Sequence, residues 1–182
     1  MRKVVANLLI SLDGVVESPE EWHFPYLSDE MQESIATQIA ETDLMLFGRN
    51  TYNIFADSWG TWGSEVPFAD DINATHKIVL SNTLTHARWR NSTLIDGELA
   101  PAVEDLQAQG GKNIAVSGSV TLVQSLLNLE LLDELNLLVH PLVLGAGRRL
   151  FPEGCRRIPF RTTRSRALRT GVLDLKLEPV RA

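Results

Sequence analysis

Three short stretches place phosphate-compatible side chains directly after an apolar run. In the first, "LMLFGRNTY" (residues 44–52), apolar residues lead straight into Gly48, Arg49 and Thr51. A glycine lets a ligand approach the backbone, an Arg guanidinium is a permanently charged planar fork, and a Thr hydroxyl can donate to a phosphate oxygen. A glycine turn, an exposed Arg and a Thr that caps the following helix would explain the same residues without a ligand.

The second stretch, "VLSNTL" (residues 79–84), places Ser81, Asn82 and Thr83 after another apolar run. These short side chains could hydrogen-bond an adenosine phosphate, and turn formation would explain them equally well. The third stretch, "AVSGSVTLVQSLL" (residues 115–127), sets a glycine between a strand pattern and a helix pattern. Its turn residues are Gly118, Ser119, Val120 and Thr121. Backbone N–H groups and the helix dipole favour a pyrophosphate here, whereas simple capping by Ser119 is the alternative.

The three stretches together predict a nucleotide site. Ligands of open parallel sheets sit beyond the carboxyl ends of the strands, and each stretch is such an end. The GxGxxG fingerprint is absent from the sequence, which argues against a standard Rossmann domain.

The elements that must position these residues alternate between strand and helix. Strand patterns cover residues 3–11, 43–48, 76–81, 112–118 and 134–145, and helix patterns cover residues 28–42, 100–111 and 119–133. This alternation predicts the α/β class, with a mostly parallel central sheet and helices on both faces. Residues 160–180 read as two strands around Gly171, which predicts a C-terminal antiparallel hairpin.

Composition narrows the class of protein. The 182 residues are 44% hydrophobic, and we expect one domain over residues 1–182. No apolar run approaches the roughly 20 residues that span a bilayer, so we expect no membrane association. The net charge of −6 disfavours nucleic-acid binding. The single cysteine, Cys155, fits a cytoplasmic location and matches no zinc spacing, so no metal is expected.

Five motifs in order resemble the dihydrofolate reductase superfamily. They are "SLDG", "LMLFGRNTY", "HKIVLSNTL", "GGKNIAVSGSVTLVQSLL" and "LDELNLLVHPLVLGAGRRLF". The likeness is greatest to the branch related to the C-terminal reductase domain of bifunctional riboflavin-biosynthesis proteins, and it covers nearly the whole chain. It implies a dihydrofolate reductase-like fold with NADPH across the strand ends, and it implies an NADPH-dependent oxidoreductase. Proteins of this resemblance are often homodimers, and the apolar segment "LNLLVHPLVL" could contribute to an interface.

The resemblance also implies roles for the polar residues. Gly48, Arg49 and Thr51 would hold cofactor phosphates, Ser81 would meet the adenosine 2′-phosphate, and residues 118–121 would cradle the pyrophosphate. Because NADH lacks the 2′-phosphate, it should bind less tightly than NADPH.

The reaction implied is hydride transfer to a C=N or C=O bond of a small flat heterocycle, such as a pterin or a pyrimidine. Residues 12–30, the substrate lip, carry Trp22 and Phe24 as stacking surfaces, although packing of the lip itself explains either one equally. Asp13 could touch the nicotinamide carboxamide or a substrate nitrogen, or only form a turn. Asp29 is the candidate helix carboxylate, or only an acid of a helix's first turn.

Other functions stay open on the sequence alone. The zinc-dependent deaminase pattern that accompanies the riboflavin-type reductase is missing, so a stand-alone reductase is expected. The main rival is a non-catalytic nucleotide-binding or regulatory protein on the same fold. His140 could relay a proton or be an ordinary strand histidine, and Arg148 and Arg149 could reach a substrate phosphate or face solvent.

Overall fold

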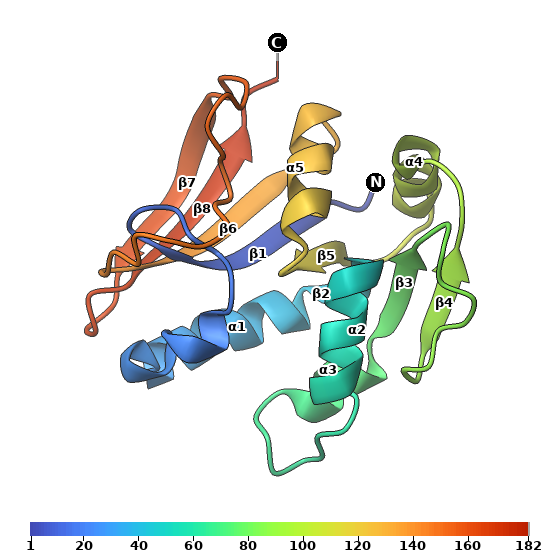
Figure 1. Cartoon of the computed structure of the whole chain (residues 1–182), viewed down its shortest axis with the longest axis horizontal. Coiled ribbons are helices and arrows are strands. Elements are labelled where there is room, and N and C mark those ends of the chain that lie inside the picture. The colour runs from blue at the N-terminus through green and yellow to red at the C-terminus, as the bar shows by residue number, and fades with distance from the viewer. Residues whose placement is uncertain (182) are drawn as a thin grey trace.

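A computed structural model describes residues 1–181 and shows one eight-stranded sheet in the order β4-β3-β2-β5-β1-β6-β8-β7 (Figure 1). The strands are β1 (Val4–Ser11), β2 (Thr42–Gly48), β3 (His76–Leu80), β4 (Ser92–Ile95), β5 (Asn113–Ser117), β6 (Glu134–His140), β7 (Phe160–Ala167) and β8 (Leu173–Pro179). The helices are α1 (Asp29–Ala40), α2 (Arg49–Ser58), α3 (Ala69–Ala74), α4 (Leu99–Ala108) and α5 (Val120–Asn128). Two short 3-10 helices, Pro19–Glu21 and Phe24–Tyr26, lie in the substrate lip.

The predicted α/β class is confirmed, and so is the C-terminal hairpin. Strands β1 to β6 pair in parallel, whereas β8 pairs antiparallel with both β6 and β7. All five predicted parallel strands are present, although β6 ends at His140 instead of residue 145, because Pro141 follows it. Helix α5 ends at Asn128 rather than 133, since Glu130 adopts a positive φ of 60° and turns the chain.

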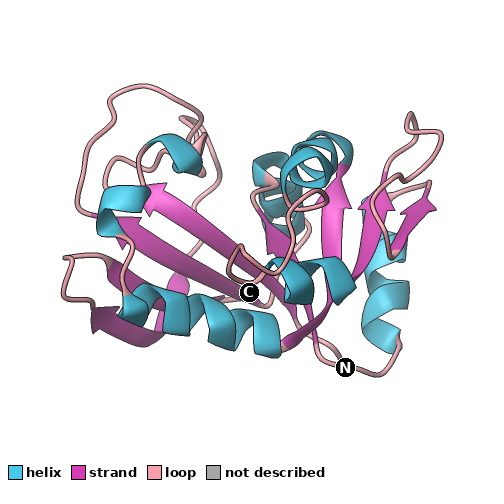
Figure 2. Ribbon diagram, turned by 90° about the horizontal axis from the view of Figure 1, so that it is seen from below, coloured by secondary structure: helices cyan, strands magenta, loops and turns pink. Residues whose placement is uncertain are grey.

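The central strands are covered on both faces (Figure 2). Helices α4 and α5 pack with the even-numbered residues of β1 in the main core, and their buried members include Val103, Val123 and Leu126. On the other face, α2 and α3 pack against β2 and β3 through Tyr52 and Ile72, and α1 packs near β6 through Met31. Burial of nearly every residue of β1 explains why it reads as an almost continuous apolar run.

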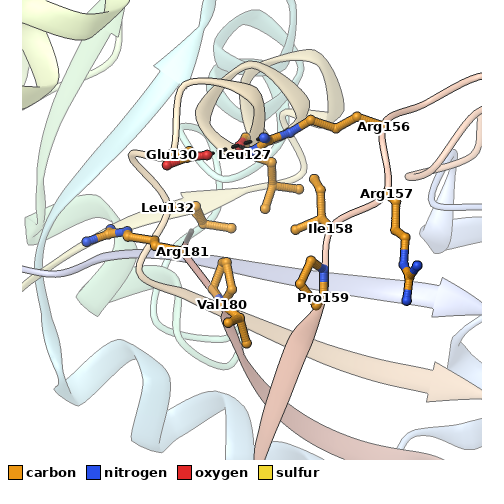
Figure 3. A pocket seen from close by; sticks show the side chains of 10 residues that line it. Leu127, Glu130, Leu132, Arg156, Arg157, Ile158, Pro159, Val180 and Arg181 are labelled. Carbon is orange, nitrogen blue, oxygen red and sulfur yellow. Dashed lines mark hydrogen bonds and ion pairs between the residues drawn. The ribbon is translucent and has the colours of Figure 1, made fainter.

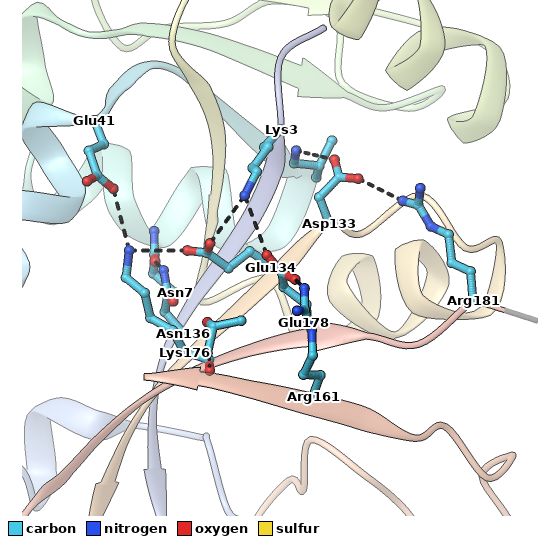
Figure 4. A network of polar contacts seen from close by, with 12 residues as sticks. Lys3, Asn7, Glu41, Asp133, Glu134, Asn136, Arg161, Lys176, Glu178 and Arg181 are labelled. Carbon is cyan, nitrogen blue, oxygen red and sulfur yellow. Dashed lines mark hydrogen bonds and ion pairs between the residues drawn. The ribbon is translucent and has the colours of Figure 1, made fainter. Parts of the chain in front are cut away.

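A network of charged side chains ties the amino ends of β1 and β6 to β8 (Figure 4). Glu134 lies 3.7 Å from the Lys3 ammonium and 3.4 Å from that of Lys176, and Lys3 also lies 3.6 Å from Glu178. Arg161 of β7 pairs with the same Glu178, so the network reaches the edge strand. The network therefore lies at the amino ends of β1 and β6, opposite to the carboxyl ends of the strands, which carry the candidate site.

The predicted interface segment "LNLLVHPLVL" is mostly inside the sheet. Strand β6 lies between β1 and β8, and its residues Leu135 and Leu137 are buried in the main core. Beyond the strand, Val143 is 68% exposed. The strand part of this segment is therefore buried by its own chain, and the exposed end beyond the strand, at Val143, is the part that could contribute to an interface.

Candidate active site

The polar strand ends converge on one edge of the sheet. Since β3, β2, β5, β1 and β6 are successive neighbours and parallel, their carboxyl ends form a row at this edge. The row carries Ser81 after β3, Arg49 after β2, Gly118 after β5 and Asp13 after β1. The sequence-predicted residues are thus brought together in this order, and the strand order that sets it could not be read from the sequence.

Gly48 and Arg49 form the junction between β2 and α2. Gly48 is the N-cap of α2, with a φ of −83° that any residue can adopt, and a Cβ added to it would project into open space. The Arg49 guanidinium is exposed and donates to Thr83 Oγ1 at 2.6 Å, which links the ends of β2 and β3. Thr51 lies inside the helix and is not its N-cap, so the capping explanation of this residue is wrong.

Ser81 and Asn82 do form a turn. Ser81 Oγ accepts the backbone N–H groups of Thr83 at 3.2 Å and Leu84 at 3.0 Å, and Asn82 Oδ1 accepts that of Gly97 at 2.8 Å. These bonds use the oxygen acceptors, whereas the Ser81 hydroxyl proton and the Asn82 amide N–H groups are the donors that a phosphate would use. The turn therefore orients both side chains at the strand end.

The Gly118 turn leads into α5 with a left-handed backbone, which glycine adopts readily, and a buried hydroxyl. Gly118 has a φ of +71°, and a Cβ there would lie 3.4 Å from Thr51 Cγ2 and Phe55 Cε2. Ser119 occupies the N-cap position of α5 but makes no capping hydrogen bond. Its Oγ is buried and has no hydrogen-bond partner within residues 1–181. Capping by Ser119 therefore does not explain this side chain, and the Oγ and the first N–H groups of α5 fit a phosphate.

Asp13 is held as a carboxylate at the end of β1. Ser11 Oγ donates to Asp13 Oδ1 at 2.7 Å, and the N–H groups of Leu144 and Gly145 donate to its two oxygens at 3.1 and 2.9 Å. The Ser11 hydrogen bond, followed by those of the Leu144 and Gly145 backbone, holds the pKa of Asp13 well below its usual range. Asp13 is therefore ionised at neutral pH and cannot act there as a proton donor.

The lip covers His140 with an aromatic cluster. The Trp22 ring meets the His140 ring edge-on with centroids 5.0 Å apart, and Tyr26 does so at 5.4 Å. Trp22 is only 8% exposed and donates to the Glu17 carbonyl, whereas Phe24 is 60% exposed. Phe24 is thus accessible for stacking, and Trp22 lies within the packing of the lip.

His140 is completely buried at the end of β6. Its Nδ1 contacts the Leu138 carbonyl at 2.9 Å, and its Nε2 has no partner within residues 1–181. Burial lowers the pKa of His140 below that of an exposed histidine. Burial also lowers the pKa of His23, with the nearby His140 as the second cause. Both imidazoles are consequently neutral at physiological pH.

Asp29 and Glu30 are both in the first turn of α1, where the helix dipole favours an acid. Asp29 is exposed. Glu30 accepts the Arg169 N–H at 2.7 Å and the Arg166 guanidinium at 3.2 Å, so it joins α1 to the β7–β8 hairpin. Glu30 is therefore committed to the fold, whereas the Asp29 carboxylate forms no hydrogen bond or ion pair within residues 1–181.

Sequence reasoning missed two residues that organise this edge. Ser11 is buried, orients Asp13 and accepts the Val15 N–H at 2.9 Å. Glu17 accepts the Arg148 N–H at 3.0 Å and so joins the lip to the segment after β6. Ser11 stands in the quoted "SLDG" motif, which was a usable signal, whereas a single Glu in a loop offers none.

A separate cavity of about 220 Å³ lies at the opposite end of the sheet (Figure 3). Leu127, Leu132, Ile158 and Pro159 form its apolar wall, and Arg156 beside it bonds to Glu130. This cavity is at the amino end of β6 and is not part of the site. Within residues 1–181, no group of three or more His, Cys, Asp or Glu residues could hold a metal ion. None of the helices described in the structure is both long and apolar enough to cross a membrane.

Comparisons with known proteins agree with this arrangement. The profile of the RibD C-terminal domain matches residues 2–173. The uncharacterized protein YyaP of Bacillus subtilis is 25% identical over 185 residues, which cover 96% of this chain and 93% of YyaP. A putative riboflavin biosynthesis protein from Shewanella superposes over 100% of both chains with a TM-score of 0.80 and 22% identity.

A pyrimidine reductase-like protein from Corynebacterium diphtheriae also shares the fold. It superposes with a TM-score of 0.64 at 12% identity, over 100% of this chain and 93% of the other. Structural likeness at these identities shows the fold, and the profile match over most of the sequence shows the family. This chain belongs to the RibD C-terminal domain family, within the dihydrofolate reductase-like superfamily.

Proposed function

We propose that the protein is an NADPH-dependent reductase that transfers a hydride to a small heterocyclic substrate, a pterin, a pyrimidine or a related ring. One observation carries the proposal, namely the row of contacts along the carboxyl edge. Arg49 contacts Thr83 beside Ser81, and Thr51 lies against the Gly118 turn. An extended dinucleotide laid along this row would meet a cationic fork and hydroxyl groups at one end and a helix N-terminus further along.

The residues present fit such a cofactor. The Ser119 Oγ is a buried polar atom with no partner among the described residues, and it stands at the N-terminus of α5. Exposed Arg49 and the donors of Ser81 and Asn82 would bind the 2′-phosphate, and Gly118 to Thr121 would bind the pyrophosphate. A Cβ added at Gly48 would meet nothing within 4 Å, so there is open space beside Arg49 at this point.

The bound nicotinamide would supply the hydride, and the chain would align the rings and exclude water. Beyond the pyrophosphate position, the row continues to the end of β1, so the nicotinamide would lie near Asp13. The ionised carboxylate of Asp13 accepts hydrogen bonds and does not deliver the proton. Phe24 and, after a movement of the lip, Trp22 would contact the substrate ring, and exposed Asp29 is the proposed carboxylate that would hold it.

The second candidate is a nucleotide-binding protein without catalysis. The saturation of Asp13 by three hydrogen bonds favours it, because this removes one of the two candidate acids from proton transfer. Turnover separates the two functions. The purified protein should consume NADPH, followed by its absorbance, with at least one member of a panel of pterins and aminopyrimidines. Saturable NADPH binding without consumption across the panel would favour the second candidate.

We also propose a cytoplasmic homodimer that binds a small molecule and neither nucleic acid nor a membrane. Light scattering on the eluted protein tests the assembly, and a mass equal to one chain of 20.2 kDa would contradict it.

A further inference from the structure

The segment after β6, residues 141–150, is fixed to the end of β1 by a set of hydrogen bonds. Asp13 accepts the Leu144 and Gly145 N–H groups, as described above. Arg149 Nε donates to the Asp13 carbonyl at 2.9 Å, and its guanidinium lies 3.5 Å from the Asp13 carboxylate. The Val16 N–H donates to the Arg148 carbonyl at 2.9 Å. The backbone around Arg148 therefore has little freedom.

This anchoring directs the Arg148 side chain to the start of α5. Its guanidinium donates to Thr121 Oγ1, in the first turn of that helix. No carboxylate of residues 1–181 forms an ion pair with Arg148, although its neighbour Arg149 pairs with Asp13. A helix N-terminus carries about half a positive charge, so a cation held beside it without an acid is unfavourable in the free protein.

Two independent features of the same place suit an anion. The cation of Arg148 faces the positive end of α5, and the buried Ser119 Oγ in the preceding N-cap position has no partner among the described residues. An anion there would be stabilised by the guanidinium and by the helix dipole, and it would accept from the hydroxyl. Buried polar groups in proteins are almost always hydrogen-bonded to protein, water or a ligand, so this hydroxyl has a hydrogen bond left to donate to an anion at this place.

We propose that Arg148 binds the pyrophosphate of the nicotinamide cofactor at the N-terminus of α5, and that Asp13 is the positioning residue that holds it there. This rests on the proposed function. It assigns Arg148 a role distinct from that of Arg49, because Arg148 contacts Thr121 in the first turn of α5, whereas Arg49 contacts Thr83 after β3. Arg49 would bind the 2′-phosphate, which NADPH has and NADH lacks, whereas Arg148 would bind the pyrophosphate, which both cofactors have.

The test measures dissociation constants for both cofactors by energy transfer from tryptophan to the reduced nicotinamide. Arg148→Ala should raise both constants by the same factor, on the order of 10-fold, because one charge-assisted hydrogen bond of the complex is lost. The preference for NADPH over NADH should stay as in the wild type. Arg49→Ala should instead reduce the preference. Arg157→Ala, which removes an exposed Arg beside the cavity at the opposite edge, is the matched control and should change neither constant.

The positioning role of Asp13 is tested by a double-mutant cycle. Asp13→Asn should weaken both cofactors, but it should weaken them little further in an Arg148→Ala background, because the residue it positions is then absent. If Asp13→Asn acted only by disturbing the structure, its effect on the dissociation constants would add in full to that of Arg148→Ala. Unchanged constants for Arg148→Ala, or a change for NADPH alone, would overturn the assignment of Arg148. Should the wild type bind neither cofactor, the proposed function fails as well, so the two failures are distinguishable.

Discussion

Gly147 is the position where the segment after β6 has least room. Its φ is +117°, and an added Cβ would lie 2.6 Å from Val15 Cγ1, far inside the roughly 3.5–4.0 Å of a favourable carbon contact. We predict that Gly147→Ala destabilises the fold by about 2–6 kcal/mol. Of this, about 1–3 kcal/mol comes from holding an alanine at a positive φ, and about 1–3 kcal/mol comes from the shifts needed to remove the overlap with Val15.

Gly145 supplies a matched control in the same segment. Its φ is +78°, and an added Cβ would meet nothing within 4 Å. Gly145→Ala should therefore cost only the left-handed backbone, about 1–2 kcal/mol. Urea unfolding of both variants, followed by circular dichroism, measures the difference. Equal losses of unfolding free energy in the two variants would refute the reasoning.

Val15 identifies the source of the overlap. Because Val15→Ala removes the Cγ1 atom that the new methyl group would strike, the double variant with Gly147→Ala should be less destabilised than the sum of the single variants, by about 0.5–3 kcal/mol. Strict additivity would show that the strain lies elsewhere. Since Arg148 follows Gly147 directly, Gly147→Ala should also weaken NADPH and NADH binding by one common factor.

Two pH dependences follow from buried groups. Burial lowers the pKa of His140 from 6.5, so below about pH 6.5 the unfolded chain binds a proton that the native site resists. As the pH is lowered through this range, the unfolding free energy should therefore decrease, by at most about 1.4 kcal/mol per pH unit, and it should decrease less steeply in His140→Phe. The same slope in the wild type and in His140→Phe would argue against this reasoning. His86→Phe, at an exposed histidine, should keep the wild-type slope. Burial, and secondly the charge of Arg90, lowers the pKa of Lys77 from 10.5 to about 8. Between pH 8 and pH 10.5 Lys77 is therefore neutral in the native state but still protonated in the unfolded chain, so the unfolding free energy should increase as the pH rises. Urea titrations at pH 8 and 10 should show this rise in the wild type and not in Lys77→Met; a rise of the same size in both proteins would show that Lys77 is not its source.

Local pattern predicted the strands that carry the site and the hairpin that ends the sheet. It did not predict β4, because Ser92–Ile95 is short and half polar, nor the six-residue α3. Strand order depends on which apolar faces pack together, and a single sequence does not show this. The predicted convergence of Arg49, Ser81 and Gly118 on one edge is confirmed because parallel strands necessarily bring their carboxyl ends together.

The chemistry of Asp13 shows where sequence reasoning fails. Its position at a strand end was predicted, but its three donors come from Ser11 and from a segment about 130 residues away, at Leu144 and Gly145. Tertiary contacts of this kind set the pKa, so the sequence could suggest a carboxylate but not its protonation. Arg148 likewise could only be named as a choice between a phosphate and solvent, because its direction is set by Asp13 and Glu17.

The binding of NADPH to the wild-type protein tests the central claim most directly. Energy transfer from the four tryptophans to the reduced nicotinamide would be followed while NADPH, and then NADH, is titrated into the protein. The account predicts saturable binding of both cofactors with a smaller dissociation constant for NADPH. Failure of both to bind would contradict the nucleotide site assigned to the carboxyl ends of the strands, and equal dissociation constants would contradict the 2′-phosphate contact assigned to Arg49 and Ser81.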